Sequence, residues 1–295
     1  MARNLHPARG QHTVTRRVLK GFAASDGRLA VFDSAHRQRK LRSPGAGIFT
    51  TNFDSWDSQG AEERWNLFEV KFPATLARVE DRTASSDAAT IGVLKDMLAL
   101  HWLRSRAMVE ARNQAVERSF ERYRKLAPDA RPDHLAAALQ QETGLIATSR
   151  SALEWTVDRI IKDVRTNELA KWHSQQNSEY FQTARSRFEQ LELHLHYTSA
   201  RDLAIGDSPV ITIIEGRFGA GPHQNVGIMK ADHVAMPISP GALVTLGARP
   251  PNAHLSDAEV DLYNDLQWST FDTWIAARPG GTADHRLKLE ASQTS

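Results

Sequence analysis

The stretch GIMKADHVAMPISPGALVTLGA, residues 227–248, reads as two apolar strands joined by a Pro-Gly turn. Two strand-like segments precede it: LELHLHYTS at 191–199 alternates apolar and polar residues, and LAIGDSPVITIIEGRF at 203–218 contains a β-branched run. Near the other end of the chain, GRLAVFDS at 27–34 and GIFTT at 47–51 have the same character. Strands are therefore expected at both ends of the chain.

The region between these strand patterns is predicted to be helical. Apolar residues recur at three- and four-residue steps from about Asp87 to Leu126 and again from about Ser149 to Leu191. A short helix closed by Gly144 is expected between them. Two long helices joined by a short one most simply pack as an antiparallel arm or bundle.

The predicted fold class is α+β, with N- and C-terminal strands in one mixed sheet and a long helical hairpin or bundle inserted in the middle. A final helix is expected from the N-cap Ser256 to just before Pro279. The expected segments are a basic β-containing part (1–85), a long-helix arm or bundle (86–191), strands and a helix completing the same α+β domain (192–280), and a loose tail (281–295).

Composition favours a protein that folds without covalent staples. The chain has 295 residues, of which 41% are hydrophobic, enough to bury a core. It contains no cysteine, which excludes disulfides, thiolate zinc sites and cysteine nucleophiles. The start, MARNLHPARG, lacks the apolar run of a signal peptide, and no run of eighteen apolar residues occurs. We therefore expect a cytoplasmic protein with no membrane association.

The net charge of +2 conceals a strong asymmetry along the chain. Residues 1–50 hold ten basic and two acidic side chains, whereas the rest holds 27 basic and 33 acidic ones. A basic segment of this kind attracts nucleic acid or another phosphate-bearing ligand through a salt-screened field. The alternative is that the basic front docks on the acidic remainder of the same chain.

The stretch QHTVTRRVLKGF, residues 11–22, combines an apolar set with a basic one. We expect the apolar side chains to enter the core and His12, Arg16 and Arg17 to line or border a polar site. The expected core residues are Val14, Val18, Leu19 and Phe22.

This stretch resembles the opening signature of the bacterial proteins grouped as domain of unknown function 4238, a His-x-Val-Pro-like segment ending in Leu-basic-x-Phe. FEVKFPATLARV, with Glu69 at the acidic position, IGDSPV at 205–210 and MPISPGALVTLG are similar to later motifs of that family in the same order, and Asn264 lies where the family tends to carry asparagine. Thr15 stands where the family usually has proline, and Ile205-Gly206 replaces its Thr-Ser. The resemblance spans about residues 11–277 and implies no established reaction.

Four polar residues are the main catalytic or binding candidates. An imidazole at His12 is suited to act as a general base or a phosphate contact, although it also suits a backbone cap. A carboxylate at Asp207 would be held on rigid backbone, or would form an ordinary Asx turn before proline. Glu69 and Arg104 either join them in one polar pocket or form a buried ion pair with no substrate. Arg104 and Asn264, with Arg16 and Arg17, are the expected substrate or phosphate contacts.

Two patterns suggest a metal. Glu192, His194 and His196 recur at every second residue, a spacing that places them on one face of a strand, although the same alternation is typical of leucines turned inward and polar groups outward. Asp207 followed by Glu215-Gly216-Arg217 faintly resembles the two acids and a cation of restriction-type nucleases, which hold Mg²⁺ or Mn²⁺.

Common catalytic motifs are missing from the sequence. It has no GxGxxG, no Gly-Lys-Ser/Thr phosphate loop, no Gly-x-Ser-x-Gly elbow and no His-Glu-x-x-His. Two function classes remain. The first is a metal-dependent nuclease or phosphodiesterase with His12, Glu69 and Asp207 as catalytic residues and Asp207 and Glu215 as metal ligands, in a defence or toxin context. The alternative is a non-catalytic module that binds nucleic acid or a protein through the basic N-terminal segment and the arginine-rich helix.

Overall fold

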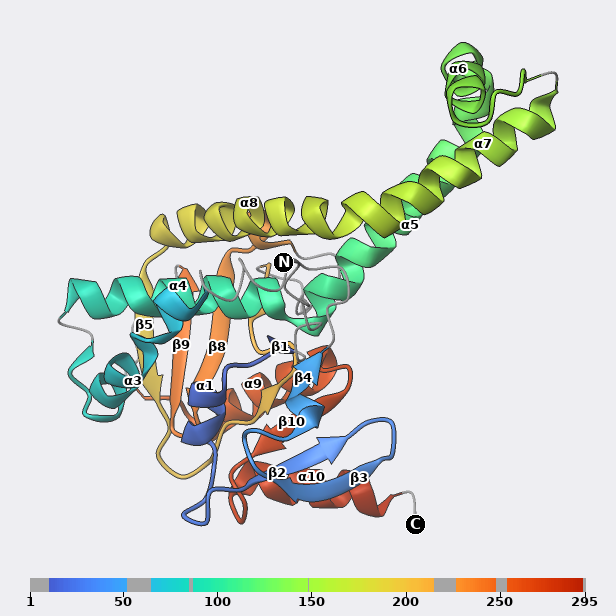
Figure 1. The fold of residues 1–295 in the computed structure, drawn as a ribbon. Helices are drawn as coiled ribbons and strands as arrows, with labels where there is room; N and C mark the ends of the chain where they lie inside the picture. Colours follow the sequence, from blue (N-terminus) through green and yellow to red (C-terminus); the bar gives the residue numbers. More distant parts are fainter. Residues whose placement is uncertain are drawn as a thin grey trace, which may run out of the picture. The chain divides into compact units, whose positions relative to one another are not determined.

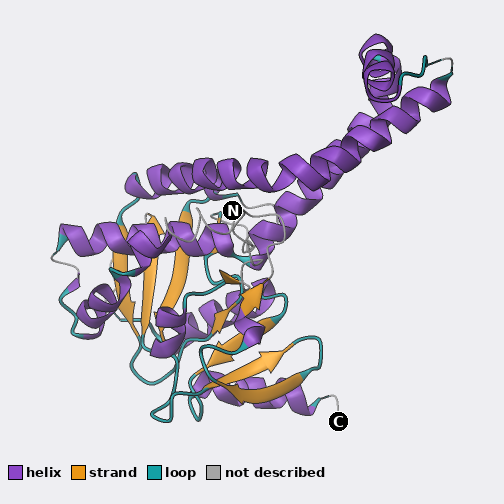
Figure 2. Cartoon of the chain, in the orientation of Figure 1, coloured by secondary structure: helices purple, strands orange, loops and turns teal. Residues whose placement is uncertain are grey.

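The computed structural model describes residues 11–51, 65–84, 87–147, 149–214, 227–247 and 254–293, without the side chains of Gln11, Thr51 and 169–175. The chain forms two compact units. The first contains residues 1–53, 58–109 and 177–295, and the second contains residues 54–57 and 110–176. Figure 1 follows the chain from end to end, and Figure 2 shows that the described strands belong to the first unit and that the second is helical.

The first unit contains two four-stranded sheets in which every pair of neighbours is antiparallel. One has the order β3 (Gln38–Arg42), β2 (Leu29–Asp33), β10 (Trp274–Ala277), β6 (Ile205–Gly206). The other has the order β5 (Leu193–Tyr197), β9 (Ala242–Gly247), β8 (His233–Ser239), β7 (Ile211–Ile213). A short ribbon pairs β1 (Gln11–His12) with β4 (Thr50–Thr51). The α+β class is confirmed, and strands from both ends of the chain do meet, but the expectation of one mixed sheet is wrong.

The two sheets are separated by the segment Asp207-Ser208-Pro209. β6 pairs with β10 and, after this segment, β7 pairs with β8. Pro209 has no N–H group to continue a ladder, and the carboxylate of Asp207 accepts backbone hydrogen bonds at the start of β10. The chain therefore leaves one sheet and enters the other within a few residues.

The predicted last helix is only partly correct. α9 (Asp257–Thr270) does begin at the N-cap Ser256, whose capping box with Glu259 is complete. It ends at Thr270, however, and the residues that follow form β10, which lies between β2 and β6 and is buried throughout. The run Trp-Ile-Ala-Ala is short and wholly apolar, so its periodicity cannot separate a helix from a buried strand. Pairing with two neighbouring strands decides for the strand.

The tail after residue 280, expected to be loose, instead forms α10 (Thr282–Ser292). Ala283 and Leu287 are buried in a cluster with residues of β2 and β10. Arg39 of β3 donates to both oxygens of Asp284, at 2.7 and 2.8 Å. The basic front of the chain therefore docks on the later part at this contact.

The first predicted long helix breaks in two at Ser105, between α4 (Ala88–Arg104) and α5 (Arg106–Ala130). Ser105 has extended backbone with ψ of 142°, and its hydroxyl accepts from the Met108 amide at 3.2 Å. The Arg106 amide donates to the Asp207 carbonyl at 3.3 Å, and the Ala107 amide donates to the Ser208 hydroxyl at 3.2 Å. The start of α5 is therefore capped from the turn that separates the two sheets.

The helices of the second unit pack in the antiparallel manner that the sequence predicts. α5 is followed by α6 (Pro132–Thr143), which ends at Gly144 with φ of 73°, and by α7 (Arg150–Asp163). The chain continues through a π-helical turn (Val164–Glu168) into α8 (Leu169–Glu189). Ion pairs join α5 to later residues in descending order, which defines an antiparallel arrangement: Glu117 with Arg165, Arg124 with Asp158, and Asp129 with Arg150.

Gln267 of α9 ties the two strands on either side of the Asp207 turn together. Its side chain is fully buried, its oxygen accepts from the Gly206 amide at 2.8 Å, and its nitrogen donates to the Pro209 carbonyl at 2.7 Å. A β-carbon on Gly206 would lie 3.0 Å from that of Phe271, so glycine allows this close approach.

We predict that Gln267→Leu lowers the free energy of unfolding by about 2–4 kcal/mol, because it leaves a buried N–H and a buried C=O without partners. Urea denaturation measures the change. Gln140→Leu, at an exposed position of α6, is the matched control and is expected to stay within about 0.5 kcal/mol of the wild type. Equal stability of the two variants would contradict the role of Gln267 in joining the two strands.

Candidate functional site

The β1–β4 ribbon fixes the position of His12. His12 is paired with Thr50, and the next amide, that of Thr13, donates to the Phe49 carbonyl at 3.1 Å. The ring of Phe49 meets the ring of Trp274 edge to face, with centroids 4.8 Å apart. Because Trp274 belongs to β10, this contact anchors the ribbon on the sheet that contains β2 and β3.

The short helix α1 (Arg16–Gly21) separates apolar from basic side chains as the sequence predicts. Val14, Val18, Leu19 and Phe22 are all fully buried, which confirms the expected core residues. Arg16, Arg17 and Lys20 are exposed on the opposite side. Three cations of the basic front therefore lie at the surface within one and a half turns of helix.

His101 of α4 holds the start of α1. The Thr15 amide donates to Nε2 of His101 at 3.2 Å, and Nδ1 of His101 lies 2.7 Å from the Met97 carbonyl, to which it donates. His101 is completely buried, and burial lowers the pKa of its imidazole to about 3. His101 is therefore neutral at physiological pH and acts as a structural support for α1.

Glu69 and Arg104 form an ion pair, at 2.5 Å between Oε1 and Nη1. The Arg104 side chain is 6% exposed and that of Glu69 is 20% exposed. The guanidinium of Arg104 lies 5.7 Å from the ring centroid of Trp65, a cation–π distance. Arg17 donates from Nη1 to the backbone carbonyl of Glu69. This contact joins α1 to the pair.

His12 lies within the electrostatic reach of these charges. Its pKa is lowered below 6.5 chiefly by burial and then by Arg16 and Arg104, while a hydrogen bond to the Pro44 carbonyl and the charge of Glu69 raise it. Nε2 is buried and has no hydrogen-bond partner among the described residues. Nδ1 is then the atom that donates to Pro44, and Nε2 carries the lone pair.

These five residues form what we call the His12 cluster: His12, Arg16, Arg17, Glu69 and Arg104. The neutral imidazole, three guanidiniums and one carboxylate sum to a charge of about +2. The guanidinium of Arg16 also lies against Gly45, where an added β-carbon would be 2.9 Å from Nη2. The cluster combines exposed cations, a buried cation and an imidazole lone pair, and this is a composition suited to hold an anion.

Asp207 is buried and its carboxylate is committed to the backbone. It is 1% exposed, and its two oxygens accept from the amides of Asp272, Thr273 and Trp274 at 2.9, 2.6 and 3.3 Å. Burial raises the pKa of Asp207 to about 6, against the lowering effect of these three hydrogen bonds. The carboxylate thus caps a segment far away in the sequence, which is a structural role different from the local Asx turn that the sequence offered as the alternative to a catalytic carboxylate.

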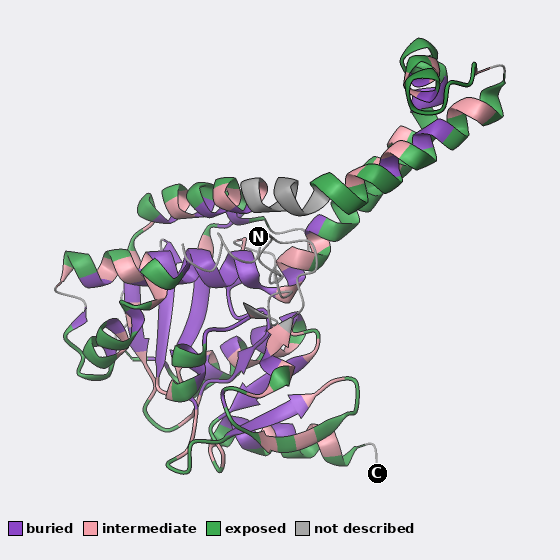
Figure 3. Ribbon diagram, viewed as in Figure 1, coloured by how far each residue is buried: buried purple, intermediate pink, exposed green. Residues whose placement is uncertain are grey.

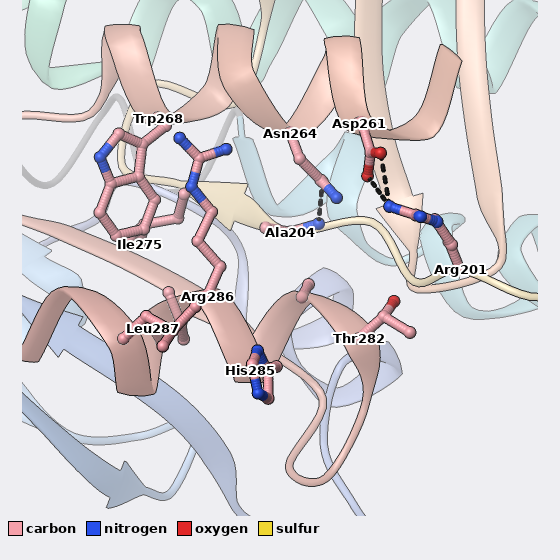
Figure 4. A pocket seen from close by; sticks show the side chains of 12 residues that line it. Arg201, Ala204, Asp261, Asn264, Trp268, Ile275, Thr282, His285, Arg286 and Leu287 are labelled. Carbon is pink, nitrogen blue, oxygen red and sulfur yellow. Dashed lines mark hydrogen bonds and ion pairs between the residues drawn. The ribbon is translucent and has the colours of Figure 1, made fainter. Parts of the chain in front are cut away.

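Asn264 is likewise occupied by backbone groups. It accepts from the Ala204 amide at 2.8 Å and donates to the Asp202 carbonyl at 3.0 Å. It lines a pocket of about 160 Å³ between α9 and α10, shown in Figure 4. The cations of this pocket have partners: Arg201 pairs with Asp261, and Arg286 pairs with an aspartate and lies 4.9 Å from the Trp268 ring.

The expected metal ligands lie only partly within the described residues. Glu215, with the loop that follows it, lies outside the described residues. In β5, His194 and His196 are buried, whereas Leu193 and Leu195 are half-buried. The expected alternation is present, but the expectation that the leucines face inward and the polar groups outward is wrong. His196 is 2.8 Å from the Thr245 hydroxyl in the adjacent strand. Among the described residues, no group of three histidine or acidic side chains has the geometry to hold a metal ion.

Comparison with known proteins identifies the family. The model of the family described as protein of unknown function (DUF4238) matches residues 10–280, and the chain belongs to this family. No curated protein and no solved structure matches the chain. In the described part of the chain, no helix has both the length and the apolar character needed to cross a membrane.

Three residues of the His12 cluster's surroundings were not singled out from the sequence as site residues: Trp65, His101 and Pro44. A signal for Trp65 exists, because it precedes Glu69 by four residues and 65–69 is helical, which places both on one helix face. His101 precedes Arg104 by three residues in α4, a second signal of the same type. Pro44 contributes only a backbone carbonyl, which sequence patterns do not reveal.

Proposed function

We propose that the His12 cluster binds a phosphate-bearing ligand. The observation that carries this proposal is the buried Nε2 of His12, which has no hydrogen-bond partner among the described residues and lies near the charges of Arg16 and Arg104. A buried acceptor without a partner costs free energy, and a ligand that donates or transfers a proton to Nε2 removes that cost. Monohydrogen phosphate or a phosphate ester with a hydroxyl supplies both that proton and the negative charge.

The guanidiniums favour phosphate over smaller anions. Arg16 and Arg17 are exposed and adjacent in the sequence. Arg104 is buried and is paired with Glu69. Planar guanidiniums bind phosphate oxygens in a bidentate manner, so two or three of them match the several oxygens of one phosphate group. The function proposed in first place is therefore recognition of a phosphate-bearing ligand without turnover.

A second candidate function is phosphodiester cleavage at the same cluster. Its support is the tautomer of His12, since an imidazole that donates from Nδ1 to Pro44 presents the Nε2 lone pair of a general base. Arg16 and Arg17 would stabilise the charge that develops on the phosphate oxygens. A metal-dependent version needs Mg²⁺ or Mn²⁺ ligands, and both oxygens of Asp207 already accept backbone hydrogen bonds. Cleavage assays with and without chelator separate these versions.

We predict that Glu69→Gln tightens phosphate binding while it destabilises the free protein. The change removes the carboxylate that neutralises Arg104, so phosphate affinity should rise about three- to tenfold. The unliganded protein should lose about 1–2 kcal/mol of unfolding free energy, because a buried guanidinium loses its charged partner. Isothermal titration calorimetry with inorganic phosphate and urea denaturation measure the two effects.

The matched control for this test is Glu117→Gln, which removes an exposed partner of Arg165 in the second unit. It should change neither quantity by more than the experimental error. Weaker phosphate binding in Glu69→Gln, with Glu117→Gln unchanged, would contradict a site in which Glu69 competes with the ligand for Arg104.

A further inference from the structure

Strand β3 carries three cations, Arg39, Lys40 and Arg42. Residues 38, 40 and 42 are exposed, whereas Arg39 and Leu41 are half-buried and contact α10 or its cluster. Figure 3 colours the described residues by burial. Arg39 is paired with Asp284. Within the described ranges, by contrast, neither Lys40 nor Arg42 forms an ion pair. Same-side residues of a strand are separated by about 6.6 Å, so these two cations form a regularly spaced row.

This row lies on the same face of the sheet as the ribbon that holds His12. Lys40 is paired with Val31, which is paired with Ala276, and Trp274 shares the face of Ala276 because it lies two residues away. The ring of Phe49 packs on Trp274, and Phe49 directly precedes β4. Figure 1 shows β3 at the sheet edge, beyond β2 and β10.

The chain connects the row directly to the His12 cluster. Arg42 ends β3, and only Ser43 separates it from Pro44, whose carbonyl accepts from His12. The next residue, Gly45, lies against the guanidinium of Arg16. Two residues of extended chain span at most about 7 Å, so Arg42 is close to the cluster. The surface cations of β3 and of α1 therefore continue from one to the other.

We propose that β3 extends the proposed phosphate site into a binding track for a single-stranded nucleic acid, and this inference rests on the function proposed above. The cations form one row along one strand, which matches the single line of phosphates of a single strand. β3 pairs only with β2 among the described strands, so its outer edge presents backbone N–H and C=O groups. Bases and sugar hydroxyls contain both donors and acceptors for this edge, whereas the internal phosphates of inorganic polyphosphate contain acceptors alone.

The test uses fluorescence anisotropy with the full-length protein and labelled oligothymidylates of about 4 and about 16 nucleotides. The wild type should bind the longer strand at least about tenfold more tightly, with an affinity that falls steeply with salt. The double variant Lys40→Gln/Arg42→Gln should bind the longer strand about tenfold more weakly than the wild type. The slope of the logarithm of its affinity against the logarithm of the salt concentration should be smaller in magnitude by about one to one and a half. The double variant should bind inorganic phosphate as the wild type does.

The matched control is Arg118→Gln/Arg122→Gln, which removes two exposed cations of α5 in the second unit and should leave all affinities unchanged. The proposed track is overturned if the wild type binds phosphate but has equal affinity for both strand lengths. It is also overturned if the β3 variant binds the longer strand as tightly as the wild type does. Either result leaves the proposed phosphate site intact. Absence of phosphate binding by the wild type would instead overturn the proposed function itself. If inorganic polyphosphate with as many phosphates as the longer strand displaces that strand and binds more tightly than it does, the assignment to nucleic acid is overturned.

Discussion

Replacement of Asp207 by alanine is expected to lower the free energy of unfolding by about 2–5 kcal/mol at pH about 5. Its carboxylate accepts from three consecutive amides, those of Asp272, Thr273 and Trp274. Alanine leaves these donors without an acceptor at the point where α9 ends and β10 begins. Chemical denaturation measures the loss, and a stability equal to that of the wild type would contradict the capping role.

Asp207→Asn provides the pH-dependent part of this prediction. The folded pKa of about 6 lies above the ordinary value of 3.8, so the folded protein binds the proton more tightly than the unfolded chain does. The resulting stability is fully present below pH about 3.8 and is lost as the pH rises through about 6. Relative to Asp207→Asn, the wild type should therefore lose about 3 kcal/mol between pH about 3.5 and about 7. A difference that does not change with pH would contradict the raised pKa.

The stability effect matters for any functional test of Asp207. A variant that loses activity because the turn between the two sheets has unfolded gives no information about catalysis. His12, Arg16 and Arg17 are better targets, since the two arginines are exposed and the imidazole is bound through one nitrogen only as far as the described residues go.

The double variant Arg16→Gln/Arg17→Gln is expected to bind phosphate about 100-fold more weakly than the wild type. Each exposed guanidinium contributes a charge-assisted hydrogen bond to a phosphate oxygen, equivalent to about tenfold in affinity. The unfolding free energy should stay within about 1 kcal/mol of the wild type, because both side chains are exposed. Calorimetric titration with inorganic phosphate measures the affinity.

The matched control for this variant is Arg118→Gln/Arg122→Gln, a pair of exposed arginines on α5 in the second unit. It should bind phosphate like the wild type. If both double variants weaken binding equally, the effect comes from the overall charge of the protein and not from the His12 cluster.

The arginine-rich helix illustrates how a basic pattern is explained by structure. Arginines of α5 and α7, among them Arg124, Arg150 and Arg159, pair with acids across the second unit. Each exposed pair contributes little by itself, but together they satisfy charges that the sequence alone presents as a binding surface. Lys40 and Arg42 of β3, like Arg118 and Arg122 of α5, form no ion pair within the described ranges, and only the two β3 residues lie next to the His12 cluster in the chain.

Local signals predicted the parts of the fold that depend on neighbouring residues. Ser256 caps α9 and Gly144 ends α6 with positive φ, both as the sequence indicates, and α4 begins next to Asp87, the predicted start of its helical pattern. The split into two sheets and the strand β10 depend on pairing between residues far apart in the chain. No local pattern contains that information, so one mixed sheet and one long last helix were the simplest expectations.

The candidate site divides in the same way. His12, Arg16 and Arg17 share one short stretch, and the amphipathic pattern of α1 predicts their polar side. Glu69 and Arg104 reach that stretch only through tertiary packing. The sequence could therefore suggest either a polar pocket or a buried ion pair but could not decide between them. The structure contains the ion pair, with His12 beside it.

The most direct test of the His12 cluster is a histidine side-chain ¹⁵N NMR titration of the full-length protein with and without inorganic phosphate, with His12→Gln for assignment. We expect free His12 to titrate with a pKa below 6.5 and its proton on Nδ1, and we expect phosphate to raise this pKa in a saturable manner. Arg16→Gln/Arg17→Gln should abolish this response. A His12 signal that is insensitive to about 10 mM phosphate at every pH would contradict the proposed site.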